Sequence, residues 1–467
     1  MTRERYLIIV SFLLFSIIFF AYYPPTYAIV DEAAYLSTAY ALRNGTFYYD
    51  QAGINQEHVS ARVGTHQVSR YPPGNSLLLL PFAFLNWHLV FVRGWLLVGI
   101  GLLLIIFLLR HYRLPETYAL LFLLHPTILL YSRTVMSDLP ASIFVLAGIC
   151  LWLGRKPGWA GILLGLSGAI RFPNLLVPAA LFGLALIQRE NRPALTMLAG
   201  TALGVVPLIA YNLFVFGSVW GSLIGYGATF APGNLPGTLF KFTVALMIFF
   251  PGMLIGIFLW PNRDRWIFLV PALATVLFYS FQSYFDFTGN MVGDLVMSLR
   301  YLLPVIPLLI VPYIGFLSRI PARPVFLRFA TGALLIFAVF LFSRHQQYLG
   351  TQVRYQREFY ARTLDARMVV CNKDIYELIN PFEKYIPWVP YEIMRQPQPV
   401  NRFKSQPGVY LACLTRENDL QRIFFSTLES FPNRVEVYTE NQPKFFSIWR
   451  NVPKPEPPPT GSGSPVQ

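Results

Sequence analysis

The sequence is poor in charged residues and in cysteine. Only 13% of its 467 residues are charged and 55% are hydrophobic, with a mean hydropathy of +0.48, whereas soluble domains carry roughly 25% charged residues. So long and apolar a chain excludes a single soluble core and indicates a polytopic membrane protein. The three cysteines show no metal-ligand spacing, and only Cys371 and Cys413, each ending a β-type run, could pair. We predict a disulfide between them if their region lies in an oxidising compartment.

Acidic residues are scarcer than basic ones. The chain has 23 Asp and Glu against 37 Lys and Arg, which gives a formal net charge of +14. The basic residues form short clusters between apolar runs and in the C-terminal region, with no repeated basic face, so we expect no nucleic-acid partner. A positive-inside bias and an anionic membrane surface or substrate explain this charge more simply.

Apolar runs dominate the first three quarters of the chain, and about eleven of them could cross a bilayer. They lie at 6–23, 89–109, 115–131, 139–154, 158–170, 173–188, 194–216, 239–260, 266–282, 300–317 and 324–342. The basic pairs of the loops all fall on one side of these spans, which predicts that this side is cytoplasmic. These pairs are Arg3/Arg5, Arg110/Arg113, Arg155/Lys156, Arg189/Arg192, Arg263/Arg265 and Arg319/Arg323. We expect a multi-pass protein of the plasma (inner) membrane with a cytoplasmic N-terminus.

The other side receives a long first loop, 24–88, and the C-terminal region. Helix-like stretches at 31–43 and 75–86 within this loop are expected to lie along the membrane surface. After Arg344 charged residues return, and β-type runs alternate with helix-like ones, which predicts a small soluble α/β domain at 344–452 on the non-cytoplasmic side. The β-type runs are Met368–Cys371, Gly408–Cys413, Arg434–Tyr438 and Phe445–Trp449. Residues 1–343 form the membrane domain, and 453–467 are Pro-, Gly- and Ser-rich and expected to be disordered.

Ionisable side chains gather at the non-cytoplasmic ends of the predicted spans. Because a charge at membrane depth is costly to desolvate, each of them is a functional candidate. Carboxylates mixed with guanidiniums suit a reaction that removes a proton and handles an anionic phosphate. The candidates are Asp31, Glu32, His58, His66, Arg70, Arg133, Asp138, Arg171, Lys241, Asp286, Asp294 and Arg300.

Structural roles are open alternatives for several of these residues. Asp31 and Asp138 have the composition and position of helix N-caps. Arg171 and Arg300 could be interface anchors that extend to the lipid headgroups. His58 and His66 lack a third ligand at metal-binding spacing and are interpreted as loop residues.

Five motifs occur in an order that resembles a known family. They are DEAAYLSTAYALRNG, SRYPPGNSLLLLP, YSRTVMSDLPASIFVLAGICLWL, GILLGLSGAIRFPNLLVP and LRYLLPVIPLL. Together they resemble the GT-C class of membrane glycosyltransferases, in the group that contains protein O-mannosyltransferases, aminoarabinose transferases and related bacterial enzymes. The resemblance covers about residues 1–345 and leaves the soluble region outside the shared motifs.

The resemblance implies roles for individual residues. The leading Asp of the family's first outer loop is the base on the acceptor, and Asp31, with Glu32 beside it, matches this catalytic position. Pro72-Pro73 match the proline pair of that loop, while the lysine often found before it is replaced here by Tyr71, with Arg70 one residue earlier. Asp138 matches a second acidic residue, and Arg300-Tyr301 match the start of a late span.

The sequence thus predicts a GT-C-like polytopic α-helical protein that transfers a sugar from a polyprenyl-phosphate donor to a hydroxyl-bearing acceptor, with inversion. Donor phosphate would be bound by Arg70 and Arg300, and by Arg171 and Lys241; Asp138, Tyr71, Tyr301 and Arg133 would contact substrate. No cofactor is required, although Asp31 with Asp138 could hold a divalent metal. A transporter or flippase of lipid-linked sugars, a lipid-linked glycan ligase or polymerase, and a membrane scaffold remain alternatives. A transporter should show internal repeats or broken helices in both halves, and neither is evident in the sequence.

Overall fold

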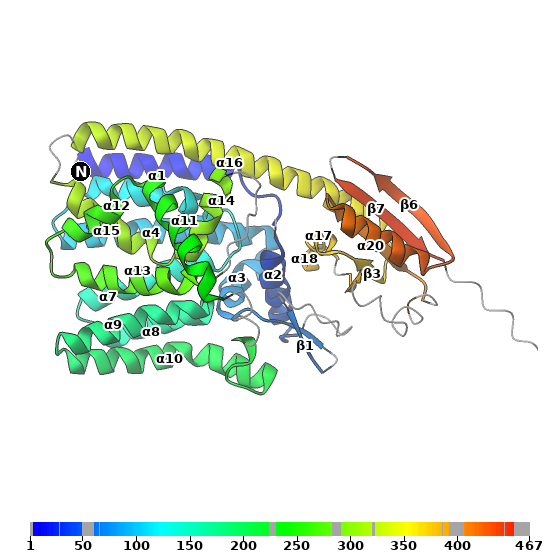
Figure 1. Ribbon diagram of the computed structural model, residues 1–467, viewed down its shortest axis with the longest axis horizontal. Helices are drawn as coiled ribbons and strands as arrows, with labels where there is room; N and C mark the ends of the chain where they lie inside the picture. Colours follow the sequence, from blue (N-terminus) through cyan, green and yellow to red (C-terminus); the bar gives the residue numbers. More distant parts are fainter. Residues whose placement is uncertain are drawn as a thin grey trace, which may run out of the picture.

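A computed structural model of the chain describes residues 3–27, 29–48, 60–64, 66–223, 230–282, 291–319, 323–384, 386–391, 403, 406–442 and 444–452. The predicted sites His58 and Asp286 and the predicted tail 453–467 lie outside these residues. Within the described ranges, sixteen helices make up the larger part of the fold, arranged as a bundle with its N-terminus at one end (Figure 1). They are α1 (Arg3–Ala21), α2 (Val30–Arg43), α3 (Gly74–Leu85), α4 (Val92–His111), α5 (Leu120–Leu123), α6 (Pro126–Ser132), α7 (Asp138–Leu153), α8 (Pro157–Ile170), α9 (Leu176–Ile187), α10 (Asn191–Phe216), α11 (Leu235–Phe249), α12 (Met253–Leu259), α13 (Arg265–Ser280), α14 (Met291–Ser298), α15 (Ile306–Leu317) and α16 (Arg323–Arg362).

Each predicted apolar run coincides with one helix or with a broken pair of helices. Among the described residues, two helices are long and apolar enough to cross a membrane by length and composition, Trp87–His111 and Asn191–Phe216, or up to four spans exist if each of two bent pairs counts as one. The outward faces of α1 and α10 expose large apolar side chains such as Ile17, Leu203 and Phe214, as helices in lipid do.

Three of the predicted spans are broken, which the sequence did not predict. The third divides into α5 and α6 at Pro126, because proline disfavours a helical conformation in the residue before it, and His125 is extended. Near Pro251 the chain bends by 86° between α11 and α12, where Gly252 has a φ of +79°. A 96° bend at Pro304 separates the segment Asp294–Leu302 from α15.

Glycines allow a close helix contact between α8 and α10. A Cβ at Gly161 would lie 2.0 Å from the Met197 carbonyl oxygen, and one at Gly204 would lie 2.3 Å from the Ile162 oxygen. Small residues at this spacing let two helix backbones approach closely. Such packing favours helix association in a membrane, where burial of apolar area contributes little to the free energy of association.

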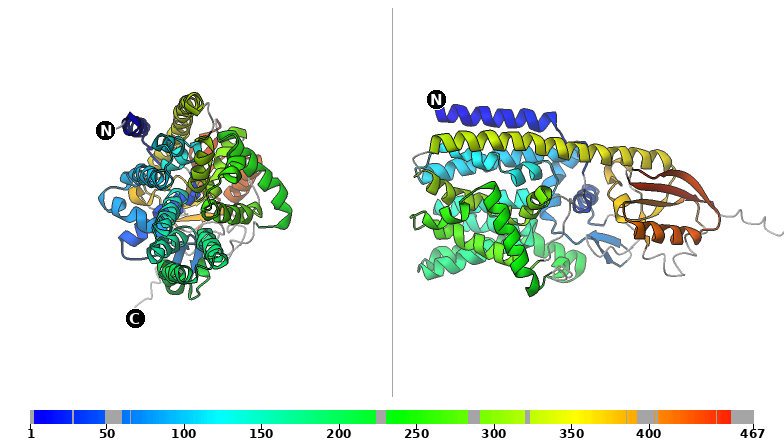
Figure 2. Two further views of the ribbon diagram at one scale, coloured as in Figure 1. Left: turned by 90° about the vertical axis from the view of Figure 1, so that its left-hand side faces the viewer. Right: turned by 45° about the horizontal axis from the view of Figure 1, so that its top comes forward.

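The loops with basic residues meet at the end of the bundle that carries the N-terminus. Arg5 and Arg110 both face Glu116, and Arg155 faces Glu190 at 3.3 Å. The opposite end carries α2, α3 and the antiparallel hairpin β1 (Ser60–Val63) and β2 (His66–Ser69), as Figure 2 also shows. α2 is largely buried between α3, β2 and the C-terminal region. Other parts of the protein therefore cover most of α2, and its predicted position along the membrane surface stays a prediction.

The C-terminal region is reached along one helix, α16, whose 40 residues run the length of the bundle and past residue 343 (Figure 1). A five-stranded sheet follows with the order β4-β3-β5-β7-β6, in which β3 pairs in parallel with β4 and β5 and the other pairs are antiparallel. Its elements are β3 (Met368–Cys371), α17 (Lys373–Tyr376), α18 (Pro381–Lys384), β4 (Trp388–Pro390), β5 (Val409–Thr415), α20 (Asn418–Glu429), β6 (Arg434–Glu440) and β7 (Phe445–Asn451). The four predicted β-type runs correspond to β3, β5, β6 and β7.

The predicted disulfide is wrong, because Cys371 and Cys413 are both buried and neither forms a disulfide. In the register of β3 and β5, Cys371 lies opposite Ala412, so Cys413 is one residue out of line. Side chains alternate between the two faces of a strand, and the thiols accordingly belong to the apolar clusters on opposite faces of the sheet.

Candidate active site

Asp31 and Glu32 begin α2 but differ in their contacts. The helix is preceded by Ile29, whose side chain cannot accept a hydrogen bond. Glu32 supplies an acceptor instead, because its carboxylate accepts the N–H of Ile29 (3.3 Å) and the N–H of Val135 (2.8 Å). Asp31 is the second residue of the helix and makes no hydrogen bond with a described residue. Its interpretation as the N-cap is therefore wrong, and its carboxylate is left open, with 20% of the side chain exposed.

Arg300 faces Asp31 from η7 (Leu299–Leu302), a single 3₁₀ turn before the break at Pro304. Its Nη1 lies 3.6 Å from Asp31 Oδ2, an ion pair beyond hydrogen-bond distance. The guanidinium also lies 4.8 Å from the Tyr301 ring centroid and donates to the Tyr301 hydroxyl at 2.9 Å. The Asp31 carboxylate and the Arg300 guanidinium are thus close enough to attract each other without forming a hydrogen bond.

A second, tighter pair joins Asp138 at the start of α7 to Arg171 at the end of α8. Arg171 Nη1 lies 2.6 Å from Asp138 Oδ1, and the Asp138 side chain is fully buried. Ser137 is the N-cap residue of α7, and no side chain caps the helix, so the capping interpretation of Asp138 is also wrong. Both arginines are nearly buried and paired with carboxylates, which rules out the alternative that they extend to lipid headgroups.

Two tyrosines connect the pairs. Arg171 donates through Nε to the Tyr279 hydroxyl (3.0 Å) and lies 5.6 Å from the centroids of both Tyr279 and Tyr301. Because Tyr301 contacts both guanidiniums, the two carboxylate–arginine pairs form one cluster of alternating charge with aromatic walls. Sequence reasoning missed Tyr279, since a tyrosine at the end of an apolar run has no distinguishing pattern.

Tyr71 is connected to this cluster by Tyr35, which contacts both Tyr71 and the residue before Asp138. Their ring centroids are 4.9 Å apart, and the Tyr35 hydroxyl lies 2.8 Å from Ser137 Oγ, one residue before Asp138. The Tyr-Pro-Pro segment can approach because Gly74 follows it: a Cβ there would lie 2.6 Å from the Ala169 carbonyl oxygen at the end of α8.

The hydrogen bonds of Arg133 indicate a structural role. Its buried guanidinium donates to the carbonyl oxygens of Phe342 (2.9 Å) and Tyr22 (2.5 Å) and to the side chain of Gln346 (2.5 Å), so it joins α6 to α16 and to the end of α1. A substrate contact by Arg133 stays a prediction that these bonds do not favour.

The remaining predicted residues are less closely placed. Arg70 follows β2 and makes no hydrogen bond or ion pair with a described residue. Lys241 lies on α11, which contacts α14 and the turn that carries Arg300. Asp294 belongs to α14, and His66 to β2.

A buried pair that sequence reasoning also missed supports the segment before Asp138. Arg93 on α4 donates to the side chain of Asn75 and to the Met136 carbonyl oxygen (3.1 Å), and Asn75 donates to the Val135 oxygen (2.9 Å). The signal was present, since Arg93 is the one charge inside the predicted span 89–109.

The cluster fits a divalent metal poorly. In the part of the chain that the structure describes, no three His, Cys, Asp or Glu side chains come together. Each of the two carboxylates faces a guanidinium instead, which supplies the positive charge that a cation would bring.

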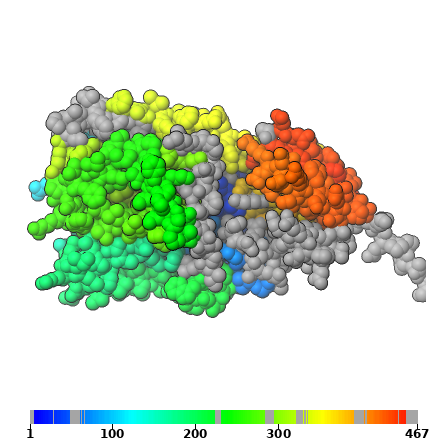
Figure 3. All heavy atoms as spheres, in the orientation of Figure 1, coloured from blue at the N-terminus to red at the C-terminus, as the bar shows by residue number. Residues whose placement is uncertain are grey.

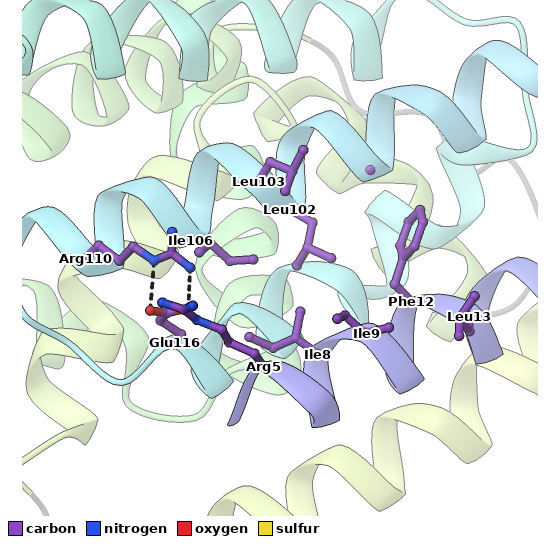
Figure 4. Close-up of a pocket in the computed structure, with 11 residues that line it drawn as sticks. Arg5, Ile8, Ile9, Phe12, Leu13, Leu102, Leu103, Ile106, Arg110 and Glu116 are labelled. Atoms are coloured by element: carbon purple, nitrogen blue, oxygen red, sulfur yellow. Dashed lines mark hydrogen bonds and ion pairs between the residues drawn. The ribbon is translucent and has the colours of Figure 1, made fainter. Parts of the chain in front are cut away.

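A cavity of about 360 Å³, drawn in Figure 4, lies between α1 and α4, and none of the residues of this cluster lines it. Apolar side chains of α1 and α4, such as Ile8, Phe12 and Leu102, line it, and at one end of it Arg5 and Arg110 converge on Glu116. These ion pairs belong to the end of the bundle with the basic loops, and the cavity contributes no residue to the candidate site.

No family model and no curated protein matches the sequence. Solved structures that match nearly the whole fold include two of the same protein. ArnT from Cupriavidus metallidurans bound to undecaprenyl phosphate aligns with a TM-score of 0.67 at 14% identity, over 95% of this chain and 98% of that one. The apo state of the same protein aligns with a TM-score of 0.65 at 12% identity over the same shares. The chain has the ArnT fold.

This match confirms, at the level of the fold, the predicted resemblance to GT-C membrane glycosyltransferases. It also corrects the extent of that resemblance. The sequence motifs end near residue 345, whereas 95% of the chain aligns with ArnT, so the C-terminal region is part of the shared fold. The motifs do not extend into the C-terminal region because a packed sheet requires apolar residues at given positions but tolerates different apolar residues there.

Proposed function

We propose that this protein is a glycosyltransferase that moves a sugar from a polyprenyl-phosphate-linked donor to a hydroxyl group of a lipid, glycan or protein acceptor. The observation that carries the proposal is the open Asp31 carboxylate, 3.6 Å from Arg300 and without a hydrogen bond to a described residue. A base next to a guanidinium is the pair that this reaction needs, and ArnT, whose fold the chain shares, binds undecaprenyl phosphate.

In the proposed reaction the acceptor's hydroxyl oxygen attacks the anomeric carbon of the sugar, and Asp31 takes the proton from that hydroxyl. The bond between that carbon and the phosphate oxygen breaks, and the electron pair leaves with the polyprenyl phosphate. A single displacement inverts the anomeric centre. Asp31 then loses its proton to water or to the departing phosphate.

Arg300 stabilises the leaving phosphate. It can exchange its long contact with Asp31 for a phosphate oxygen, because charge-assisted bonds to phosphate are short and directional. Arg171 is already in contact with Asp138, so its main effect is to hold Tyr301, and through it Arg300, in place. Arg70 and Lys241 remain further candidates for the phosphate.

We place this reaction on the non-cytoplasmic side of the inner membrane. The support is the separation of the two ends: basic loops lie at the end with the N-terminus, and the candidate site lies at the other.

Removal of the protein tests the proposal. A mass spectrum of the lipid extract should show accumulation of one polyprenyl-phosphate sugar, which wild-type protein restores to its normal level and Arg300→Gln does not. An unchanged lipid pool with unchanged surface glycans would overturn the enzyme proposal.

A flippase of lipid-linked sugars is the second candidate. The two sharply bent helix pairs fit it only in part, because both lie in the second half of the membrane domain and a transporter should show such breaks in both halves. The two candidates differ in the bond that is broken. Purified protein incubated with the accumulated lipid and with membranes of the deletion cells should release free polyprenyl phosphate, whereas a flippase leaves the lipid-linked sugar intact.

A further inference from the structure

The C-terminal region holds the start of α2, the helix that carries Asp31. The Val30 N–H, the first of the helix, donates to the Glu377 carboxylate at 3.2 Å. The first N–H groups of any helix lack partners within the helix, and Ile29 in front of α2 has no side-chain acceptor. Glu377, far along the chain, therefore caps the Val30 N–H, while the local residue Glu32 caps only the N–H of Ile29.

Further contacts fix the turn in which Glu377 lies. The Tyr27 hydroxyl, before α2, donates to the Ile379 carbonyl oxygen at 2.6 Å. Gln356 on α16 donates to the Leu378 oxygen at 3.0 Å. Glu377 is thus held from two sides and approaches Val30 from a fixed backbone.

A second contact lies further along α2. The Tyr40 ring meets Phe382 of α18 edge to face, with centroids 5.4 Å apart. The C-terminal region therefore contacts α2 at both its first turn and its third. The later part of that region (orange to red) lies beyond this end of the bundle in the space-filling view (Figure 3).

The position of Asp31 depends on these contacts between the C-terminal region and α2. Its carboxylate has no hydrogen bond of its own to a described residue, so the backbone of the first turn sets its place relative to Arg300. That turn is held by Glu32 at Ile29 and by Glu377 at Val30. A misplacement of about 1 Å of a reacting group can cost roughly 10²-fold in rate.

We propose that Glu377 is a positioning residue for the base: it caps α2 from the C-terminal region and so makes the geometry of Asp31 depend on the docking of that region. This rests on the proposed function, in which Asp31 is the base. If Glu377 positions Asp31, its loss should lower turnover rather than donor affinity. The reason is that Arg300, the proposed phosphate ligand, lies on η7 and not on α2.

The test uses purified full-length protein and the polyprenyl-phosphate sugar that accumulates in deletion cells, with membranes of those cells supplying the acceptor. Glu377→Ala should lower kcat by about ten- to a hundredfold with the donor KM within about twofold of wild type. Glu377→Gln keeps an oxygen that accepts the Val30 N–H and should retain most of the activity. Glu436→Ala, an exposed carboxylate on β6, is the matched control and should behave as wild type.

Hydrogen exchange gives a second readout that does not use activity. The amides of residues 30–33 should exchange faster in Glu377→Ala than in wild type or Glu377→Gln, because the first turn loses its cap. If Glu377→Ala does not fold, Glu377→Ser, too short to reach Val30, replaces it in both measurements.

The outcomes separate this inference from the proposed function. A fully active Asp31→Asn protein means that Asp31 is not the base, whatever Glu377 does. If Asp31→Asn is inactive while Glu377→Ala keeps a normal kcat and normal exchange, the positioning role is overturned. It is overturned equally if Glu377→Gln fails as Glu377→Ala does, or if the donor KM rises with kcat unchanged.

Discussion

The ion pair between Asp138 and Arg171 gives the sharpest stability prediction. The two atoms are 2.6 Å apart, with the Asp138 side chain fully buried and Arg171 only 11% exposed. Removing one partner of a buried pair leaves a charge in a low-dielectric surrounding and costs about 3–5 kcal/mol. Asp138→Asn and Arg171→Gln should each lower the thermal unfolding midpoint of the purified protein by many degrees.

Two controls make this prediction decisive. Asp138→Asn combined with Arg171→Gln removes both charges and should recover part of the loss. Glu190→Gln, which breaks the exposed pair with Arg155, should change the midpoint little, because exposed pairs contribute little. If Asp138→Asn alone is as stable as wild type, the Asp138 carboxyl carries no charge in the folded protein. The description of the site as two ion pairs would then be incorrect.

Three further predictions concern topology, thiols and helix packing. A reporter fused after Arg344 should be active only outside the cytoplasm; a cytoplasmic signal would refute the proposed orientation. Cys371 and Cys413 should alkylate equally before and after reduction and only slowly until the protein unfolds, since both are buried and burial raises the pKa of the Cys413 thiol to about 12; a reduction-dependent increase would reveal a bridge. Gly161→Val should lower stability because its Cβ meets the α10 backbone, whereas Gly183→Val, with nothing within 4 Å of a Cβ, should not; equal effects would contradict the close packing of α8 and α10.

Much of the fold could be predicted because hydrophobic periodicity is local. The expected helix 31–43 is α2, Val30–Arg43, and the expected runs near residues 368, 408, 434 and 445 are strands. The breaks near residues 125, 251 and 304 were visible as prolines, but a proline inside an apolar run is compatible with both a kink and a break. Which of the two occurs depends on the neighbouring helices.

The site could be predicted residue by residue but not as pairs. Asp31, Asp138, Arg171 and Arg300 were all expected at the same end of the spans, since a charge beside an apolar run needs a reason to be there. Nothing in the sequence assigns Arg300 to Asp31 rather than to Asp138, because that choice depends on how the distant helices pack.

The difference between Asp31 and Glu32 also lay outside the sequence. Successive residues of a helix point about 100° apart, so one carboxylate turns to the Val135 amide and the other to Arg300. Which is which depends on the rotation of α2 about its axis. Contacts with α3 and with the C-terminal region, through Tyr40 and Phe382 among others, fix that rotation.

The central claim, that Asp31 is the base of a sugar transfer, is tested most directly by the rate of transfer in purified Asp31→Asn protein. Glu436→Gln serves as the control for a lost surface carboxylate, and undecaprenyl phosphate binding reports an intact phosphate site. Loss of a general base costs about 10²–10⁴-fold in rate, so the account predicts a folded protein that binds undecaprenyl phosphate and has nearly no turnover. Turnover close to that of wild type would contradict it.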